Sequence, residues 1–371
     1  MRLRAGLLAA LFSLLLAGSA EGAPRATSIS AGPGITCATL AGGSVECWGR
    51  DYVGGTINHR PAPVAGITEA VAVSEGIHYT CALLRSHRVM CWGDDGYGQL
   101  GDGSTSDSPT PVPVQGISNA IAISAGGYHA CALLQGGGAA CWGRNLHGAL
   151  GDGSRANSSI PVAVRGLTGA SKIYAGTMQE ETCALLESGL VRCWGFNGTG
   201  QLGMPRAGDL VAPATVPSIT GARDIATSGG HTCAVLTNGQ VKCWGKNSSG
   251  QLGDGTLTDS IAPVTVRGLR RASAVAVDPL GYSCAVLRTG AVYCWGHNPK
   301  NQLGDRRFPA GSAVPVRAVG VAHAVAITTA VGHACALLRS GAAECWGYDD
   351  YGQLGDGARP PLVRDATRVA F

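Results

Sequence analysis

Charge is scarce in this chain of 371 residues. Charged side chains make up 14% of it, and 28 basic against 24 acidic residues leave a formal net charge of +4. Proteins that bind nucleic acid carry a much larger basic excess, gathered on one face or in a tail. The composition therefore predicts that no nucleic acid is among the partners.

Signatures of catalysis are also lacking. The sequence has no Gly-x-Ser-x-Gly turn, no phosphate-binding loop and no zinc-protease helix motif, and its carboxylates are scattered through turn-like segments. The fourteen cysteines fall into regularly spaced pairs, so none remains as an unpaired candidate nucleophile. We predict that the protein is not an enzyme, with no catalytic residue, no cofactor and no metal.

Only one long apolar run is present, over residues 7–16. Arg2 and Arg4 precede the run, and the small residues Gly18 and Ala20 follow it at the −3 and −1 positions of a cleavage point. This pattern is typical of a secretory leader, and the run is too short to span a bilayer as a helix. We expect residues 1–20 to be a signal peptide and the mature chain to be secreted or periplasmic, without a membrane span.

Glycine, by contrast, is abundant at 57 residues, and the tryptophans are regular. All seven lie in the tripeptide Cys-Trp-Gly, at intervals of 44 to 52 residues. A period near fifty indicates a repeat architecture. We assign residues 21–371 to one domain of seven units. The approximate units are residues 26–69, 70–119, 120–169, 170–221, 222–271, 272–322 and 323–371.

Each unit contains four short apolar or β-branched segments bounded by turn residues. In the third unit these are residues 120–124, 131–134, 139–142 and 161–164, and no segment has a helical period. Four strands repeated seven times predict an all-β, seven-bladed propeller of four-stranded antiparallel blades. The N-terminal and C-terminal strands, near residues 26–31 and 366–371, are expected to close the ring.

The repeated motifs resemble those of a known family. Gly-Gln-Leu-Gly occurs at residues 98–101, 200–203, 250–253 and 352–355, together with Gly-x-x-His and Val-x-x-Trp-Gly elements. These motifs resemble the regulator of chromosome condensation repeat, in a secreted, disulfide-containing form of bacterial type. The first unit departs from the pattern, with Gly-Gly-Thr at residues 54–56, and so does Met204, where other units have Asp.

The cysteines follow one rule: every pair is Cys-x9-Cys. A tight hairpin between the second and third strands would bring the two cysteines of a pair opposite each other, within disulfide reach. Zinc is the alternative, but its usual ligand spacing is much shorter. The expected pairs are Cys37–Cys47, Cys81–Cys91, Cys131–Cys141, Cys183–Cys193, Cys233–Cys243, Cys284–Cys294 and Cys335–Cys345.

Strand order also predicts a working face. The loops from the first to the second strand and from the third to the fourth share one side of the disc, and eight of the twelve Tyr and Phe residues beyond the leader map to it. Tyr79 and Tyr282 are among those eight, whereas the recurring histidines are interpreted as loop braces and the tryptophans as packing between blades. The residues expected to bind a partner there are Tyr52, Tyr97, Tyr128, His147, Met178, Glu180, Phe196, His297, Tyr348 and Tyr351.

The function expected from this reasoning is an exported, monomeric, non-enzymatic protein-interaction module. A protein that binds glycans or cell surfaces is the alternative. The resemblance also implies two further readings: inhibition of a secreted enzyme, and guanine-nucleotide exchange. Calcium binding near Asp102 and Asp107, and glycosylation of the sequons at Asn157, Asn197 and Asn247, stay open at this point.

Overall fold

Seven four-stranded sheets make up the protein. The structure, a computed structural model, describes residues 24–205, 208–358 and 363–371, so the expected leader at residues 1–20 lies outside the described residues. In chain order, four to a sheet, the strands are β1 (Ala26–Gly32), β2 (Ile35–Leu40), β3 (Val45–Arg50), β4 (Ile57–Pro63), β5 (Ala70–Glu75), β6 (Tyr79–Leu84), β7 (Val89–Gly93), β8 (Ser108–Pro113), β9 (Ala120–Ala125), β10 (His129–Leu134), β11 (Ala139–Gly143), β12 (Ser158–Ala163), β13 (Ala170–Ala175), β14 (Glu181–Leu186), β15 (Val191–Gly195), β16 (Leu210–Thr215), β17 (Ala222–Ser228), β18 (His231–Leu236), β19 (Val241–Gly245), β20 (Ser260–Thr265), β21 (Ala272–Val277), β22 (Tyr282–Leu287), β23 (Val292–His297), β24 (Gly311–Arg317), β25 (Ala324–Ala330), β26 (His333–Leu338), β27 (Ala343–Tyr348) and β28 (Val363–Arg368).

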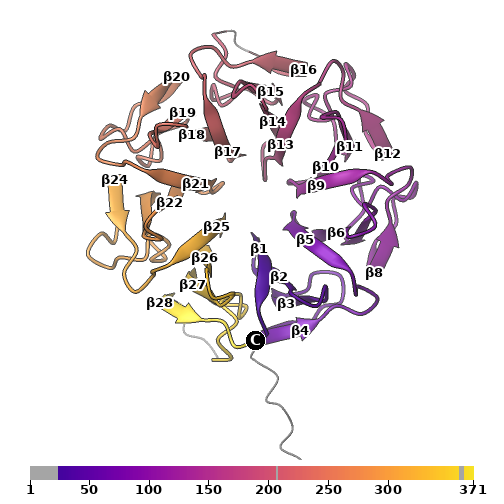
Figure 1. Cartoon of the computed structure of the whole chain (residues 1–371), viewed down its shortest axis with the longest axis horizontal. Helices are drawn as coiled ribbons and strands as arrows, with labels where there is room; N and C mark the ends of the chain where they lie inside the picture. The colour runs from indigo at the N-terminus through magenta and orange to yellow at the C-terminus, as the bar shows by residue number, and fades with distance from the viewer. Residues whose placement is uncertain (1–23, 206–207, 359–362) are drawn as a thin grey trace, which may run out of the picture.

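Each sheet is a propeller blade. Its four strands are consecutive in the chain and antiparallel, and we number the blades 1 to 7 in chain order. In Figure 1 the first strand of each blade lies beside the central opening and the fourth lies on the rim. No described residue is helical. The predicted all-β, seven-bladed architecture is therefore confirmed.

The second and third strands of every blade form the expected hairpin. In blade 3 its register places Cys131 opposite Cys141. All seven pairs are joined in the same way, with S–S distances of 2.01–2.11 Å, in agreement with the expected pairing. The hairpin turn needs glycine at Gly137, which has a φ of 76° and where a Cβ would come within 2.7 Å of the Gly169 nitrogen.

Neighbouring blades contact each other through the Gly-Gln-Leu-Gly segment, or its variants Gly-Ala-Leu-Gly at residues 148–151 and Asn-Gln-Leu-Gly at residues 301–304, which we call the junction loop. In blade 2, Leu100 is 0% exposed, and the carbonyl oxygen of Gln99 accepts a hydrogen bond of 2.9 Å from Nε1 of Trp142 in blade 3. Trp142 packs in one apolar cluster with Cys81 and Cys91 of blade 2. The tryptophan thus packs between blades, as the sequence indicates.

The same indole bond recurs at five more junctions, with lengths of 2.8–2.9 Å. The donor–acceptor pairs are Trp194 with Ala149, Trp244 with Gln201, Trp295 with Gln251, Trp346 with Gln302 and Trp48 with Gln353. Six junctions are therefore alike, and the junction between blades 1 and 2 differs from them.

Three buried histidines also connect adjacent blades. In each case Nε2 lies 2.8–2.9 Å from a hydroxyl group of the next blade: His129 with Thr182, His231 with Ser283 and His333 with Thr36. Burial lowers the pKa of these histidines to about 4, about 3 and about 4, respectively. They stay neutral at physiological pH and brace the ring, in agreement with the structural role interpreted from the sequence.

The two ends of the chain meet in adjacent blades. Strand β1 packs against β25 and β26 of blade 7, the Ala26 nitrogen donates to the Gly341 carbonyl at 2.8 Å, and the Ala31 nitrogen donates to Thr328 Oγ1 at 3.1 Å. No sheet in the described part of the chain contains strands from both ends. The ring therefore closes by packing of the first blade on the last.

Candidate interaction face

One side of the disc carries the longer loops, and we call it the loop face. It is formed by the loops from first to second strand and from third to fourth strand, since these connections lie at the same end of antiparallel neighbours. In blade 3 the third-to-fourth loop covers residues 144–157, whereas the hairpin turn on the opposite side covers only residues 135–138. The loop face therefore carries the longest connection of the blade.

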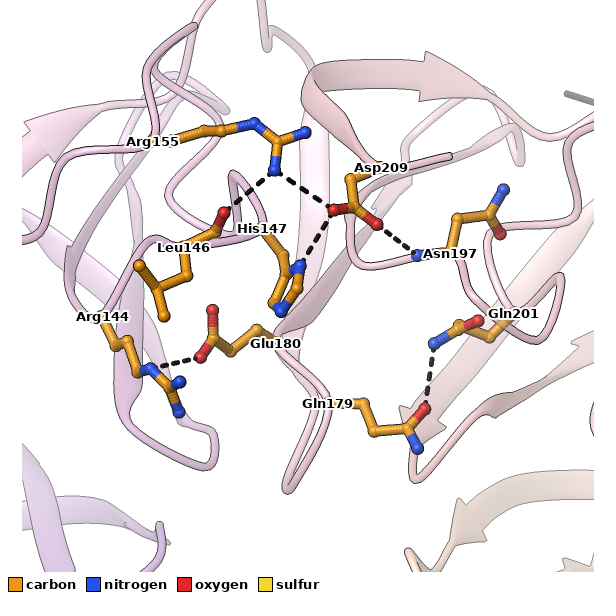
Figure 2. Close-up of polar contacts among 9 residues, drawn as sticks. All are labelled: Arg144, Leu146, His147, Arg155, Gln179, Glu180, Asn197, Gln201 and Asp209. Atoms are coloured by element: carbon orange, nitrogen blue, oxygen red, sulfur yellow. Dashed lines mark hydrogen bonds and ion pairs between the residues drawn. The ribbon is translucent and has the colours of Figure 1, made fainter. Parts of the chain in front are cut away.

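A compact aromatic and cationic cluster lies on this face over blades 2 to 4. The Arg144 guanidinium lies 5.0 Å from the ring centre of Tyr97 and 5.6 Å from that of Tyr128. The two rings meet edge to face, with their centres 5.3 Å apart. Arg144 also forms an ion pair of 2.8 Å with Glu180 of blade 4 (Figure 2). With Met178, these residues form what we call the blade 2–4 patch.

Two acidic residues, Glu180 and Glu181, stand where the loop before β14 meets the strand, but they do not form an acidic surface. Glu180 is 4% exposed and paired with Arg144, and Glu181 is 0% exposed. Burial raises the pKa of Glu181 to about 7. Met178 is 52% exposed, and its backbone lies beside Gly127. The loop therefore offers solvent an apolar side chain rather than a free charge.

A polar cluster adjoins this patch around Asp209. Its Oδ2 lies 2.9 Å from His147 Nδ1 and 3.2 Å from Arg155 Nη1 (Figure 2). The Asn197 nitrogen donates to Oδ1 at 3.2 Å. Burial raises the pKa of Asp209, but the bonds from His147 and Asn197 outweigh it and hold that pKa below its ordinary value. The His147 ring is packed on Phe196, with centres 4.8 Å apart.

A second aromatic cluster lies where the ring closes. The Tyr52 ring stacks on His78 with 3.7 Å between centres. The Arg50 guanidinium lies 4.7 Å from the Tyr52 ring and 5.4 Å from the Tyr351 ring, and Tyr348 packs edge-on against Tyr351 at 6.3 Å. Blades 1, 2 and 7 therefore share one group of aromatic side chains on the loop face.

Nine of the ten residues singled out in the sequence thus fall into these three groups. His297, at the end of β23, is the exception. Its Nδ1 is buried and has no hydrogen-bond partner among the described residues. The prediction that Tyr79 and Tyr282 belong to the loop face was wrong, because their side chains are buried, at 2% and 0% exposed. Their hydroxyl groups donate to the carbonyls of His129 and His333 in the next blade, where they brace the junction.

Sequence reasoning missed Arg50, Arg144, Arg155 and Asp209. A signal existed for the first two: Arg50 and Arg144 directly follow Cys-Trp-Gly, in the same repeat position as Phe196. Comparison of the seven units at that position would have found them. Asp209 had no such signal, because it follows the irregular stretch at Met204.

The structure also bears on calcium binding, on the glycosylation sequons and on the expected absence of a membrane span. Asp102 and Asp107 accept hydrogen bonds from the backbone of Ser104 and Asp95, the role of turn formers. Asn197 and Asn247 are 4% and 0% exposed, whereas Asn157 is exposed. Nowhere in the described ranges is there a helix of the length and hydrophobicity needed to cross a membrane.

Comparisons with known proteins agree with this architecture. Two models of the regulator of chromosome condensation (RCC1) repeat match this chain. One matches residues 86–133 and 238–278. The other matches residues 70–99, 120–149 and 222–251. A mouse secretion-regulating guanine nucleotide exchange factor is 32% identical over 97 residues, which span 25% of this chain and 21% of that protein.

Two solved structures show the same fold. Human WBSCR16 has a TM-score of 0.75 at 21% identity, with 85% of each chain covered. Yeast RCC1 (Prp20), solved bound to Kap60, has a TM-score of 0.75 at 20% identity, with 93% of this chain and 85% of that chain covered. At this level of identity, the likeness concerns the fold alone.

Proposed function

The chain belongs to the regulator of chromosome condensation repeat family, and we propose that it is an exported, non-enzymatic module that binds a protein partner with its loop face. Relatives support the general role: yeast Prp20 was solved bound to Kap60, and its structure was studied together with its binding to Gsp1p and histones. Those partners belong to that protein. What we infer for this chain is protein binding by a rigid ring.

The blade 2–4 patch carries the proposal. Tyr97 is 38% exposed, Met178 is 52% exposed and the neighbouring Leu146 is 50% exposed. Protein interfaces are enriched in Tyr, Met and Arg, and such residues dominate binding energies when a partner covers them. Arg144 lies against both tyrosines and is held by Glu180. The patch is therefore ordered before a partner arrives, which reduces the entropy lost on binding.

Export is supported by the cysteines. Seven disulfides, with no free cysteine in the described residues, fit an oxidising compartment. A glycan-binding role has less support, because the six junction-packed tryptophans are 0–1% exposed and cannot form platforms for sugars.

The proposal is tested by affinity capture from the medium or envelope of the source cells, with the double variant Tyr97→Ala, Arg144→Ala in parallel. We expect a stoichiometric protein partner with the native chain and at least a tenfold loss of it with the variant, since each hot-spot truncation costs about 1–2 kcal/mol or more. The matched control is Ile160→Ala, an exposed apolar residue of the outer strand β12, which should retain the partner. Equal recovery by all three proteins would contradict the proposal.

A further inference from the structure

The junction between blades 1 and 2 lacks the loop that fills the other six. Strands β3 and β4 are connected by residues 51–56 alone, whereas residues 94–107 connect β7 and β8, and the short connection has no Gly-Gln-Leu-Gly. A cavity of about 210 Å³ lies at this junction. At the other junctions the loop's leucine is 0% exposed: Leu100, Leu150, Leu202, Leu252, Leu303 and Leu354.

Trp92, which lines this cavity, differs from the other six tryptophans. It is partly exposed, whereas they are 0–1% exposed. Those six donate their indole N–H to a junction-loop carbonyl, but Trp92 has no hydrogen bond to any described residue. An aromatic donor is thus in place without its usual acceptor.

The hydroxyl group of Thr80, a second donor in the same pocket, has a different acceptor from its equivalents in other blades. At the equivalent position in other blades, Thr232 and Ser283 donate to the junction-loop carbonyl at 2.8 and 3.0 Å. Thr80 occupies this position in blade 2 and instead donates to Glu75 Oε2 at 2.7 Å. Both groups that would hold the missing carbonyl are therefore present.

Glu75 is the third departure from the repeat, and it lines the same cavity. It is 3% exposed, and its Oε1 has no hydrogen-bond partner among the described residues. Burial raises the pKa of Glu75 to about 8, so the carboxyl holds a proton at neutral pH and can donate to an incoming acceptor. The equivalent residues in the other blades are small or apolar: Ala31, Ala125, Ala175, Thr227, Val277 and Thr329.

A metal is a poor occupant. The sulfurs of Cys37 and Cys47 lie within 4.8 Å of a Glu75 carboxylate oxygen. They are joined to each other in a disulfide, however, and therefore supply no thiolate. The lining is mixed, with apolar side chains such as Ile35 and Val64 and polar ones such as Asn58 beside the two donors and Glu75. Such a lining suits a segment of polypeptide that offers both an apolar side chain and a backbone carbonyl.

We propose that this cavity binds a loop of the partner protein that presents a leucine-sized side chain next to a free backbone carbonyl, the chemistry of the missing junction loop. On binding, the Thr80 hydroxyl turns its one proton from Glu75 to this carbonyl, which also accepts from Trp92 Nε1, and the side chain fills the cavity. Its volume is adequate, because an apolar protein cavity of about 150 Å³ accommodates benzene. The six junction leucines of this chain are buried, so a second copy in the same fold cannot supply the loop.

This inference rests on the proposed function and specifies one contact of it. Tyr52 and His78, which stack on each other at the loop face, also line the cavity. A protein docked on that face can therefore reach the cavity with a single loop, while its main contacts lie on the blade 2–4 patch.

The test uses the uncharged pentapeptide acetyl-Tyr-Gly-Gln-Leu-Gly-amide, whose sequence is that of residues 97–101 and 351–355. It is titrated into the intact protein while tryptophan fluorescence is followed. We expect a saturable change in fluorescence that Trp92→Phe abolishes. Replacement of the peptide leucine by alanine should raise the dissociation constant by roughly tenfold or more. The absence of saturation at millimolar peptide, or an equal affinity for the alanine peptide, would overturn the proposal.

Two variants of the protein separate this site from general surface binding. Replacement of residues 51–56 by the sequence of residues 94–107 supplies the missing loop within the chain and should eliminate peptide binding. Glu75→Ala restores the residue found at Ala125 and Ala175, and should weaken the peptide about fivefold through loss of one hydrogen bond. Unchanged binding by both variants would also overturn the proposal.

Failure of this inference is distinguishable from failure of the proposed function. If the peptide does not bind while Tyr97→Ala, Arg144→Ala still loses the captured partner, the cavity site is wrong and the loop-face role stands. If the peptide binds while that double variant retains its partner, the loop-face patch is wrong and the cavity site stands.

Discussion

Reduction of the seven disulfides is expected to unfold the propeller in the absence of denaturant. Each bridge joins cysteines separated by 10 residues in sequence, and closing a loop of this size removes about 2–3 kcal/mol of denatured-chain entropy. If their effects add, seven such bridges contribute on the order of 15–20 kcal/mol. This exceeds the roughly 5–15 kcal/mol by which ordinary domains are stable.

The measurement is equilibrium unfolding followed by tryptophan fluorescence, for the oxidised chain and for the same chain kept in excess reductant. We expect a cooperative transition for the first and none for the second. The single-bridge variant Cys131→Ala, Cys141→Ala is the control, and it should stay folded with a loss of about 2–3 kcal/mol. A reduced chain that keeps a native transition would show that the blades hold without their bridges.

Acid is expected to destabilise the ring through its three inter-blade histidines. The folded-state pKa values of His129, His231 and His333 are lowered by burial to between about 3 and about 4, against an ordinary value of 6.5. Below pH 6.5 the unfolded chain therefore binds protons that the folded chain does not. The stability that these histidines contribute is complete above pH 6.5 and is lost as the pH falls to 4, by about 3 kcal/mol for each.

The buried carboxyls act in the opposite direction. The raised pKa values of Glu75 and Glu181, about 8 and about 7, mean that their contribution decreases as the pH rises above 4.5. The histidine effect is therefore measured as a difference between native protein and the triple variant His129→Gln, His231→Gln, His333→Gln. The free energy of unfolding should fall by about 9 kcal/mol less in the variant between pH 6.5 and pH 4.

Single His→Gln variants make the same measurement where the triple variant is too unstable. Each should remove about a third of the pH-dependent difference, because the three histidines occupy separate junctions. If native and variant proteins lose stability in parallel over this range, the histidines do not titrate with unfolding, and their role as neutral braces is contradicted.

The blades could be predicted from sequence because the repeat makes each feature visible seven times. The spacing of Cys131 and Cys141, with Gly137 between them, defines a hairpin in one unit, and the other units repeat it. Strand order then determines which loops share a face, so Tyr97 and Tyr128 could be placed together before their contact was known. Periodicity and strand alternation are local properties of the chain, so they can be recognised in the sequence alone.

What the sequence could not reveal is which side chain an exposed loop turns inward. Glu180 lies in a polar loop, yet it is buried because Arg144 of the preceding blade reaches it. Asp209 likewise gathers His147 and Arg155 from another blade. These contacts cross a junction between blades, where the pairing depends on packing geometry and on loop lengths that vary from unit to unit.

The open junction between blades 1 and 2 could be predicted only in part. The sequence shows that residues 54–56 replace the usual motif, but it does not show that this loss leaves Trp92 without its acceptor. Nor does it link that loss to Glu75, an acidic residue at a strand position where the other blades have small or apolar residues. The link appears only when blades 1 and 2 are placed side by side, with both residues lining one cavity.

Hydrogen exchange of the seven tryptophan indole N–H groups, observed by NMR, tests the central claim most directly. Six junctions closed by the chain's own loops should give six slowly exchanging signals, and the junction between blades 1 and 2 should give one fast signal that Trp92→Phe removes. Seven equally protected signals, or a fast signal that persists in Trp92→Phe, would contradict the account of one junction left open for a partner.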